Sequence, residues 1–258
     1  MTILQLHNQK VTIDQGELVG YVVDGHEYIH QKGSPGWRSS DTEMFPIIGP
    51  TAEADFKVWT PKGNAILDQH GLLREMPYVL KLSSSTTAIF QKAYKAGTKV
   101  RNSKYPKKST EKELHWPYDF RFQKRFHLTR EGLEIVFTIS GEEGMPFMLG
   151  YHPAFKLHSG TPYIQANNTN IALSEVLAVG SRALQVANCT RITLKDKREL
   201  HLEAKGFGGF MLWTEVPNMI CLEPITFYPY AVDQKDLNEG FQVLSKEEME
   251  FGVLIRAL

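Results

Sequence analysis

Four short clusters of the chain carry the side chains best suited to chemistry. They are residues 44–50, 70–74, 150–155 and 221–224. In the last two clusters an ionisable residue comes directly before proline, His152 before Pro153 and Glu223 before Pro224. Because a residue before proline is held in an extended conformation, we expect both side chains where strands end, and strand ends are common places for sites. An imidazole and a carboxylate often exchange protons with a substrate near neutral pH.

Each of these clusters also has an ordinary structural explanation when it is taken alone. A histidine beside aromatic residues is often a hydrogen-bonded structural residue, and Glu223 alternates with Cys221 and can simply face water. The order of the four clusters along one chain favours a shared site over four unrelated coincidences.

The sequence lacks the motifs of several common enzyme classes. It has no Gly-x-Ser-x-Gly nucleophile elbow, no phosphate-binding P-loop and no Cys-x-x-Cys pair. The segment 206–209 does not have the spacing of a dinucleotide loop. His26 and His30 are four residues apart, which on a strand is about 13 Å, so the two rings are too far apart to share one ion. We therefore expect neither a metal nor a cofactor.

Strand signals dominate the elements that must position these clusters. Residues 17–31 predict a hairpin that turns at Asp24-Gly25, and residues 191–204 predict a second one that turns at Asp196-Lys197. Residues 133–140 alternate between apolar and other side chains, as a strand does. Further β runs span 210–222 and 251–255, and the only helix candidates are 67–74 and 174–184.

Composition and charge exclude several classes of function. The chain has 258 residues, and 29 Lys and Arg balance 29 Asp and Glu, which argues against a nucleic-acid binder. No apolar run approaches the ~18 residues of a membrane span, and residues 1–11 show no signal-peptide core. Cys189 and Cys221 are expected to be buried free thiols, which fits a reducing, cytoplasmic setting.

The organisation of the chain is simple apart from one basic stretch. No linker, low-complexity tract or internal repeat divides it, so we expect a single domain over residues 1–258. Lysine and arginine crowd together between Lys92 and Lys112. This stretch has two explanations, a solvated loop between strands or a rim that attracts an anion to a site.

The clusters together resemble the aldose 1-epimerase (galactose mutarotase-like) superfamily, and most closely its shorter bacterial branch of LacX-type proteins. Nearly the whole chain takes part in the resemblance. It is carried by the opening hairpin with the pair Trp37-Arg38, by Phe45-Pro46-Ile47-Ile48-Gly49, by His70-Gly71-Leu72-Leu73-Arg74, by Gly150-Tyr151-His152-Pro153-Ala154-Phe155 and by Cys221-Leu222-Glu223-Pro224.

The resemblance implies both a fold and an activity. The fold would be an all-β supersandwich of large antiparallel sheets with few short helices and an open carbohydrate site. Members of the superfamily interconvert the α and β anomers of free sugars. The matching positions make His152 the general acid and Glu223 the general base, and His70 and Arg74 would line the substrate. The partner would be a small carbohydrate, with no nucleic acid and no membrane, and the protein a monomer or weak homodimer.

The chemistry of anomerisation suits these side chains. Ring opening takes a proton from the anomeric hydroxyl and gives one to the ring oxygen, and it needs no redox step. An imidazole with a pKa of about 6.5 can donate, a carboxylate near 4.3 can accept, and we expect the two on opposite sides of the sugar. Five aromatic residues are candidates for a sugar platform or for ordinary core packing: Trp37, Phe45, Tyr151, Tyr228 and Tyr230.

Three departures from the pattern leave the substrate open. Pro50 stands where many LacX-like sequences carry Arg, so that cation is either missing or supplied by Arg38 or Arg74. His30 stands where the opening hairpin usually has Trp. The Asp that longer mutarotases place between their acid and base has no match.

Three alternatives to a free-sugar mutarotase remain open. The first is a catalytically silent protein that binds or senses carbohydrate on the same fold. The second is an epimerase of a hexose 6-phosphate, with the stretch 92–112 holding the phosphate. The third is a glycoside hydrolase, which needs a second carboxylate about 5–9.5 Å from Glu223. Asp233 is the candidate for that role.

Overall fold

The computed structural model describes residues 1–258, and strands are its dominant secondary structure. Every strand pair in its sheets is antiparallel. The largest sheet has nine strands, in the order β18 (Thr169–Ala172), β17 (Tyr163–Ala166), β20 (Arg191–Lys195), β21 (Glu199–Lys205), β25 (Glu248–Ala257), β13 (Leu133–Gly141), β12 (Phe120–Leu128), β9 (Thr87–Tyr94) and β8 (Val79–Ser83).

A six-stranded sheet lies beside the nine-stranded one. Its strands are β19 (Leu184–Ala187), β22 (Gly209–Trp213), β23 (Met219–Ile225), β15 (Gly150–Tyr151) and β5 (Glu43–Met44), with β16 (Ala154–Lys156) also paired to β23. The N-terminal residues form a four-stranded sheet of β1 (Thr2–Leu6), β2 (Gln9–Asp14), β3 (Glu17–Val23) and β4 (His26–Glu27). These layers give the antiparallel sandwich that the sequence predicts.

The remaining elements are short. Three two-stranded sheets pair β6 (Lys57–Val58) with β7 (Ala65–Ile66), β10 (Val100–Arg101) with β11 (Glu113–Leu114), and β14 (Pro146–Phe147) with β24 (Gln242–Val243). There is one α-helix, α1 (Leu173–Val179), and there are five 3₁₀ helices, η1 (Ala52–Ala54), η2 (Leu73–Glu75), η3 (Gly180–Arg182), η4 (Pro229–Ala231) and η5 (Gln234–Gly240). No helix has the length and apolar character needed to cross a bilayer.

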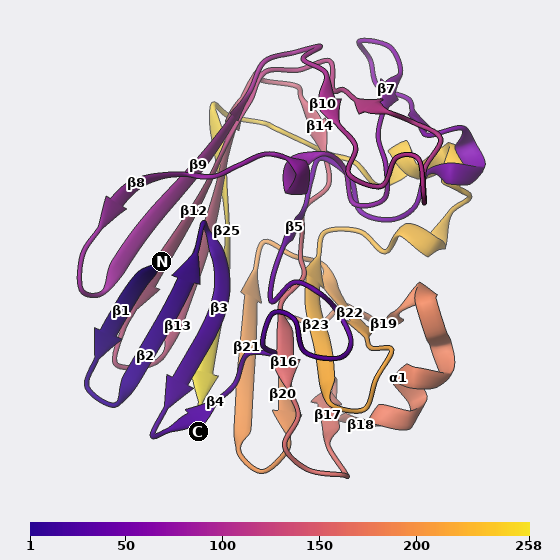
Figure 1. Ribbon diagram of the computed structural model, residues 1–258. Coiled ribbons are helices and arrows are strands. Elements are labelled where there is room, and N and C mark those ends of the chain that lie inside the picture. Colours follow the sequence, from indigo (N-terminus) through magenta and orange to yellow (C-terminus); the bar gives the residue numbers. More distant parts are fainter.

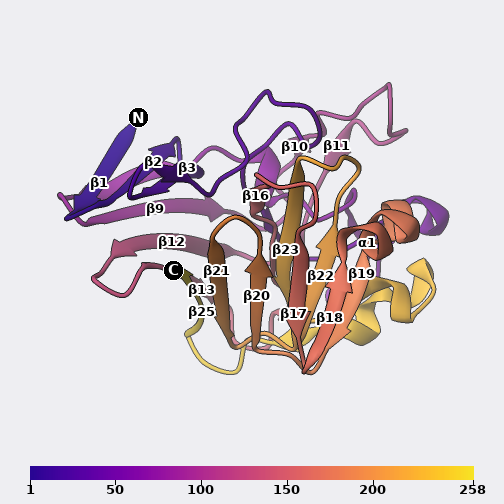
Figure 2. The same ribbon diagram turned by 90° about the horizontal axis from the view of Figure 1, so that it is seen from below.

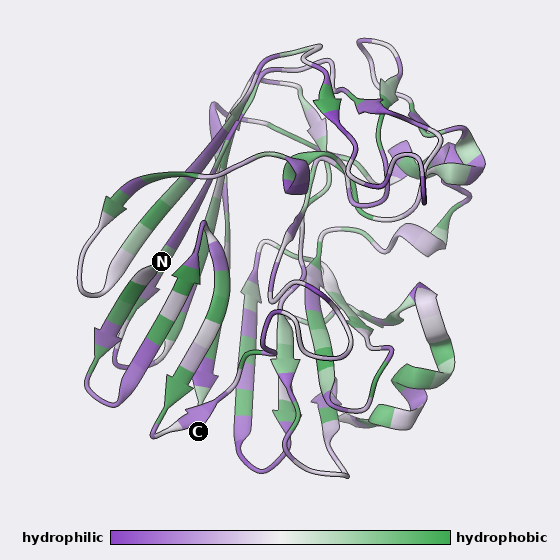
Figure 3. Cartoon of the chain, in the orientation of Figure 1, coloured by the Kyte–Doolittle hydropathy of each residue, from purple (hydrophilic) through white to green (hydrophobic).

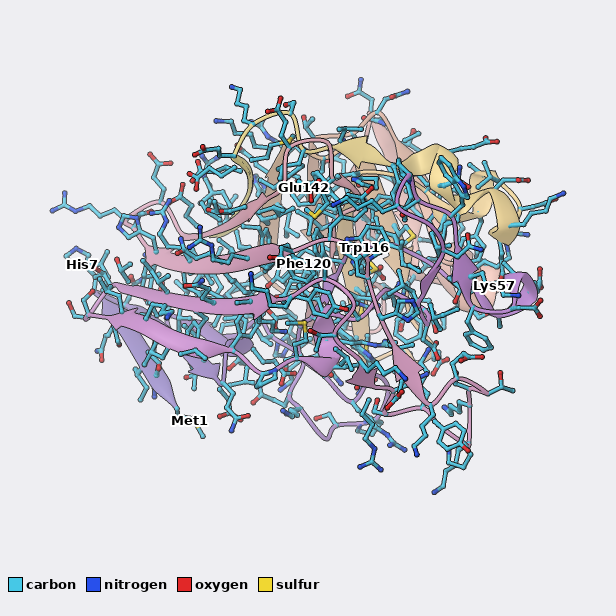
Figure 4. The ribbon with its side chains drawn as sticks, turned by 90° about the horizontal axis from the view of Figure 1, so that it is seen from above. Met1, His7, Lys57, Trp116, Phe120 and Glu142 are labelled. Atoms are coloured by element: carbon cyan, nitrogen blue, oxygen red, sulfur yellow. The ribbon has the colours of Figure 1, made fainter.

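Figures 1 and 2 show how the layers are arranged. Strands β8, β9 and β12 form a tall curved wall, with β1 and β2 packed against it. The strands β22 and β23 lie beside β17, β20 and β21, and α1 covers their outer end (Figures 1 and 2). In Figure 4 the labelled side chains Trp116 and Phe120 lie toward the middle of the molecule, whereas His7 and Lys57 lie near its two ends.

Alternating side chains build the core between these layers. Along β13 the residues Leu133, Ile135, Phe137 and Ile139 are fully buried, as the alternation predicts, and they belong to one cluster of 61 buried apolar residues. Apolar and polar bands alternate along the strands of the N-terminal sheet in Figure 3, which is the pattern of a sheet with one face on the core.

The predicted hairpins and helices hold with local differences. The first hairpin turns at Asp24 and Gly25, both with positive φ, but its return strand β4 is short. It is short because the Glu27 carboxylate accepts hydrogen bonds from the amides of Tyr21 and Ile29 where ladder bonds would continue. The second hairpin joins β20 and β21 through a three-residue connection. The predicted helix at 174–184 overlaps α1, which begins one residue earlier, whereas 67–74 holds only the start of η2.

Candidate active site

One cavity of about 440 Å³ brings together the four side chains predicted from the sequence. His70, Arg74, His152 and Glu223 all line it. The other lining residues include Trp37, Arg38, Thr42, Lys108, Met211, Trp213 and Tyr230. Residues that are more than 150 positions apart in the chain therefore share one space, and the reason lies in the register of the six-stranded sheet.

The strand register places His152 across from Glu223. Gly150 pairs with Ile225 and Ala154 pairs with Cys221, so the same register, continued between them, sets His152 opposite Glu223. Directly opposite residues in an antiparallel pair have their side chains on the same face, about 5 Å apart at Cβ. Pro153 and Pro224 lack the N–H of a ladder bond, and β15 gives way to β16 at this point.

The same register continues to the strands on either side. Thr42 and His152 exchange backbone hydrogen bonds of 3.3 and 2.8 Å, and Met211 pairs with Glu223. Thr42, His152, Glu223 and Met211 thus form a row across four neighbouring strand segments, and all four line the cavity. One face of the six-stranded sheet is the floor of the candidate site.

One expectation about these two residues is wrong. His152 does follow the end of β15, but Glu223 lies within β23 and not at its end. A proline is tolerated inside β23 because the adjacent strand is itself interrupted at Pro153. No continuous hydrogen-bond ladder there requires the backbone N–H that Pro224 lacks.

The imidazole of His152 and the carboxyl of Glu223 are in direct contact. His152 Nε2 lies 3.4 Å from Glu223 Oε1, and the side chains are only 9% and 2% exposed. Both groups have sealed atoms with no hydrogen-bond partner in the protein, Nδ1 of His152 and Oε1 of Glu223. The expected arrangement was an acid and a base on opposite sides of a sugar, whereas in the structure the two groups lie side by side.

Burial sets the charge state of this pair. Removal from water lowers the pKa of His152 to about 3 and raises the pKa of Glu223 well above its usual 4.5. Burial therefore favours the uncharged form of both groups. In these uncharged forms the proton would lie on the Glu223 carboxyl and the free lone pair on the His152 ring, whereas the resemblance implies His152 as the acid and Glu223 as the base.

A buried ionic cluster fixes the segment around Thr42, the backbone partner of His152. Lys124 Nζ lies 2.5 Å from Asp41 Oδ2 and 2.7 Å from Glu43 Oε1, the two residues that flank Thr42. The Tyr151 hydroxyl donates to Asp41 at 2.7 Å. Burial raises the pKa of Asp41 to about 6, so Asp41 is ionised at pH 7 and pairs with the Lys124 ammonium. The cluster thereby fixes both residues adjacent to the Thr42–His152 pair.

His70 lies in a turn with two successive positive φ angles. Its φ is 68° and that of Gly71 is 77°; a Cβ on Gly71 would collide with the Phe45 carbonyl, which explains the glycine. The Gly49 N–H donates to His70 Nδ1 at 3.2 Å, and the His70 and His152 ring centroids are 5.9 Å apart. Burial lowers the pKa of His70 well below 6.5, so a neutral ring with Nδ1 as acceptor is consistent with this bond.

Aromatic rings form two walls of the cavity. The Trp37 ring stacks on His152 with a centroid distance of 4.0 Å, and Trp213 meets it edge-on at 5.8 Å. His30, the departure from the usual Trp, is buried and lies 3.1 Å from the Trp37 carbonyl through Nε2, so it positions the Trp37 backbone. This places His30 outside the cavity-lining set.

The five aromatic candidates divide between the cavity and the core. Trp37 and Tyr230 line the cavity. Phe45 and Tyr151 are fully buried core residues, and Tyr228 packs on Tyr230 without lining the cavity. Trp213 is a cavity residue that the sequence analysis missed; only its pairing with Cys221, two residues from Glu223, reveals it.

The basic stretch between Lys92 and Lys112 also divides into residues that line the cavity and residues that do not. Lys95 and Lys99 form exposed ion pairs, as a solvated loop predicts. Lys104 binds Asp68 at 2.7 Å, which ties the loop to the segment before His70. Lys108 then lines the cavity and forms no ion pair of its own.

Both candidates for the cation that Pro50 replaces are arginines of the cavity wall. Arg38 and Arg74 both line the cavity; Arg38 has no ion pair, and the one ion pair of Arg74 is to Glu75 at 3.7 Å. Asp233, the candidate second carboxylate for hydrolysis, begins η5 and does not line the cavity. Glu215 is the other lining carboxylate, and it is exposed.

Solved structures with the same fold are known. A galactose mutarotase-like protein from Lactobacillus casei superposes over 100% of both chains with a TM-score of 0.81 at 18% identity. A galactose mutarotase related enzyme from Lactobacillus acidophilus covers 99% of this chain and 96% of its own, with a TM-score of 0.78 at 17% identity. The fold is therefore that of the galactose mutarotase-like proteins.

Sequence comparison adds the family. The family model described as Aldose 1-epimerase matches residues 57–208, a range that includes His70, Arg74 and His152 and ends before Glu223. The chain belongs to the aldose 1-epimerase family. It is 23% identical over 167 residues to the chromosomal protein LacX of Lactococcus lactis subsp. lactis, which is 60% of this chain. The chain spans about half the length of the curated relatives it matches.

Proposed function

We propose that this protein is a mutarotase, which interconverts the α and β anomers of an aldose by proton transfer through His152 and Glu223. One observation carries the proposal: an imidazole and a carboxyl group, each nearly sealed from water, lie 3.4 Å apart on the floor of a cavity with aromatic and cationic walls. Membership in the aldose 1-epimerase family supports the class of reaction.

The side-by-side arrangement suits the reaction because the two oxygens that exchange protons are bonded to the same carbon. Glu223 gives its proton to the ring oxygen, and His152 takes the proton of the anomeric hydroxyl. The bond between C1 and the ring oxygen breaks, and C1 becomes the carbonyl carbon of an open-chain aldehyde. The pair is then a carboxylate and an imidazolium, each opposite in charge to its neighbour and close enough to stabilise it.

Ring closure reverses these steps on the other face of the carbonyl. After rotation about the C1–C2 bond, the hydroxyl that was the ring oxygen attacks C1 and returns its proton to Glu223. His152 returns its proton to the carbonyl oxygen, which becomes the new anomeric hydroxyl. Both residues end the cycle as they began, and general acid and general base typically contribute about 10²- to 10⁴-fold each.

Polarimetry tests the proposed activity. Freshly dissolved α-glucose and α-galactose should approach their equilibrium rotation faster with the protein than without it. Binding of either sugar without such acceleration would instead support a carbohydrate-binding protein on the same fold.

A second candidate is favoured by the cations of the cavity wall. Arg38, Arg74 and Lys108 line the cavity with a single ion pair among them, so the wall can receive an anionic group such as a sugar phosphate. If the substrate is a hexose 6-phosphate, Lys108→Gln should raise KM at least about tenfold for that sugar, with little change for the neutral sugar. Lys107→Gln is the matched control, because Lys107 lies next in the loop and does not line this cavity.

We also propose that residues 1–258 fold as one domain. The 61-residue apolar cluster includes Leu4 near one end and Ile255 near the other, so no separate core divides the chain. A single cooperative unfolding transition, seen identically by circular dichroism and tryptophan fluorescence, is expected. Two separated transitions would contradict it.

A further inference from the structure

We propose that His152, Cys221 and Glu223 form a binding site for a thiophilic divalent cation such as Zn²⁺, with one coordination position open to the cavity. The three side chains are buried, and one ligand atom from each lies within 4.8 Å of the other two. Cys221 has no role in the proposed proton transfer, so this site is additional to the proposed function.

The sheet register explains why three ligand types meet here. Cys221 and Glu223 are two residues apart on β23 and project from the same face. His152 lies across from Glu223, which makes it the diagonal neighbour of Cys221. The nitrogen, sulfur and oxygen donors therefore form a triangle on one sheet face, held by backbone pairing on both sides.

The spacing of the donors suits a small tetrahedral ion. Zinc bonds of about 2.0–2.3 Å set neighbouring donors of a tetrahedron roughly 3.4–3.8 Å apart. The His152 Nε2 to Glu223 Oε1 distance is 3.4 Å, which already matches. Since no separation exceeds 4.8 Å, closure by about 1 Å completes the triangle, a movement that rotation of the Cys221 and Glu223 side chains can supply.

One corner of the triangle is an unsatisfied buried atom. Oε1 of Glu223 is sealed from solvent and has no hydrogen-bond partner, and the side chain is only 2% exposed. Buried polar atoms are nearly always satisfied, and each exception calls for an explanation. A cation between the three donors would satisfy this oxygen.

The charges balance when such an ion binds. The thiol proton of Cys221 and the carboxyl proton of Glu223 leave to solvent, and the His152 ring stays neutral. The two anionic ligands then cancel the double charge of the ion, so the buried complex carries no net charge. Three protein ligands with a fourth position left for water is the common arrangement of accessible zinc sites.

Occupancy would inhibit the proposed mutarotase, because the ion takes the lone pair of His152 and the proton of Glu223 together. This consequence rests on the proposed function, whereas the binding itself does not. Binding and activity are therefore measured separately.

The binding experiment uses the full-length protein with Cd²⁺ and Zn²⁺. Cd²⁺ should produce the ultraviolet charge-transfer band of a cadmium–thiolate bond at one equivalent, and equilibrium dialysis should recover one tightly held Zn²⁺. The band should vanish in Cys221→Ser, and Zn²⁺ affinity should fall by more than the roughly 10- to 100-fold expected of a residue that only supports a ligand. Cys189→Ser is the control and should keep both signals, because Cys189 is also a buried thiol but hydrogen-bonds to Arg191 elsewhere.

Several results would overturn the site. The site is ruled out if the wild type binds no stoichiometric ion. It is also ruled out if Cys221→Ser keeps the thiolate band or binds Zn²⁺ as tightly as the wild type does. Binding by surface histidines such as His26 and His158, whose rings are 4.1 Å apart, would give no thiolate band and counts against the proposal.

In the activity arm each protein is compared with its own rate in chelator, and Zn²⁺ should inhibit the wild type at lower concentrations than Cys221→Ser. If no sugar is turned over, the mutarotase proposal fails while the binding arm still decides the metal site.

Discussion

His152 lies directly across from Glu223 at the break between β15 and β16, and the two side chains meet at 3.4 Å. Register alone creates this contact, since Gly150–Ile225 and Ala154–Cys221 are paired on either side of it. Burial favours the uncharged form of both groups.

Substitution of Glu223 by glutamine should not destabilise the protein. Burial raises the pKa of Glu223 well above 4.5 and so favours the neutral carboxyl, which the neutral amide of Glu223→Gln closely resembles. We expect the free energy of unfolding at pH 7, from urea titration, to change by less than about 1 kcal/mol. A loss of several kcal/mol would mean that an ionised Glu223 stabilises the fold.

The pH dependence of activity should lack the usual histidine limb. Because the pKa of His152 is lowered to about 3, its lone pair remains available as the pH falls through 6.5. The acid limb of kcat/KM should therefore lie near pH 3, or at the pH where circular dichroism shows unfolding. On the alkaline side, activity should fall only as Glu223 loses its proton. An acid limb with a midpoint near 6.5 would show that His152 is an ordinary, solvated imidazole.

Lys92 should make stability rise with pH. It is 5% exposed, and burial lowers its pKa from 10.5 to about 8. The folded protein therefore releases this proton near pH 8 and the unfolded chain near 10.5, so deprotonation favours the folded state between these values. The shift corresponds to about 3 kcal/mol. The difference in unfolding free energy between wild type and Lys92→Met should change by that order from pH 8 to 10.5; a constant difference would contradict the shift.

Lys124 should be far more important for stability than an exposed lysine. Lys124→Met leaves Asp41 and Glu43 buried without the cation that contacts both, and breaking a buried pair typically costs about 3–5 kcal/mol. Lys95→Met, which removes an exposed pair with Asp119, is the control and should leave the melting temperature nearly unchanged. Equal effects of the two changes would argue against the buried cluster.

Local sequence patterns predicted the strands well. The alternation at 133–140 and the Asp24-Gly25 turn reflect backbone geometry that depends mainly on neighbouring residues. The structure has β13 and the first hairpin at these places. The rule for residues before proline also describes one residue at a time. It located His152 at the end of β15 and failed for Glu223, because whether β23 ends at Pro224 depends on the strand beside it.

The contacts of the site depend on pairing across long stretches of chain, which spacing does not reveal. The resemblance predicted that His70, Arg74, His152 and Glu223 share one site. It did not predict how they are arranged there or how far apart they lie. Trp213 and Cys221 become visible only once the register of β22 and β23 is known. Nothing in the sequence distinguishes Lys108 from the other lysines of its stretch. The hydrogen bond from Lys104 to Asp68 brings the loop, and Lys108 with it, to the cavity.

The most direct test of the central claim compares two glutamates of the same cavity. The rate of anomer exchange, measured by NMR saturation transfer at the anomeric protons, should fall about 10²- to 10⁴-fold in Glu223→Gln. Glu215→Gln makes the same change at an exposed lining residue and should stay within a few-fold of the wild type. Retention of full exchange by a folded Glu223→Gln protein would show that this carboxyl does not move the proton.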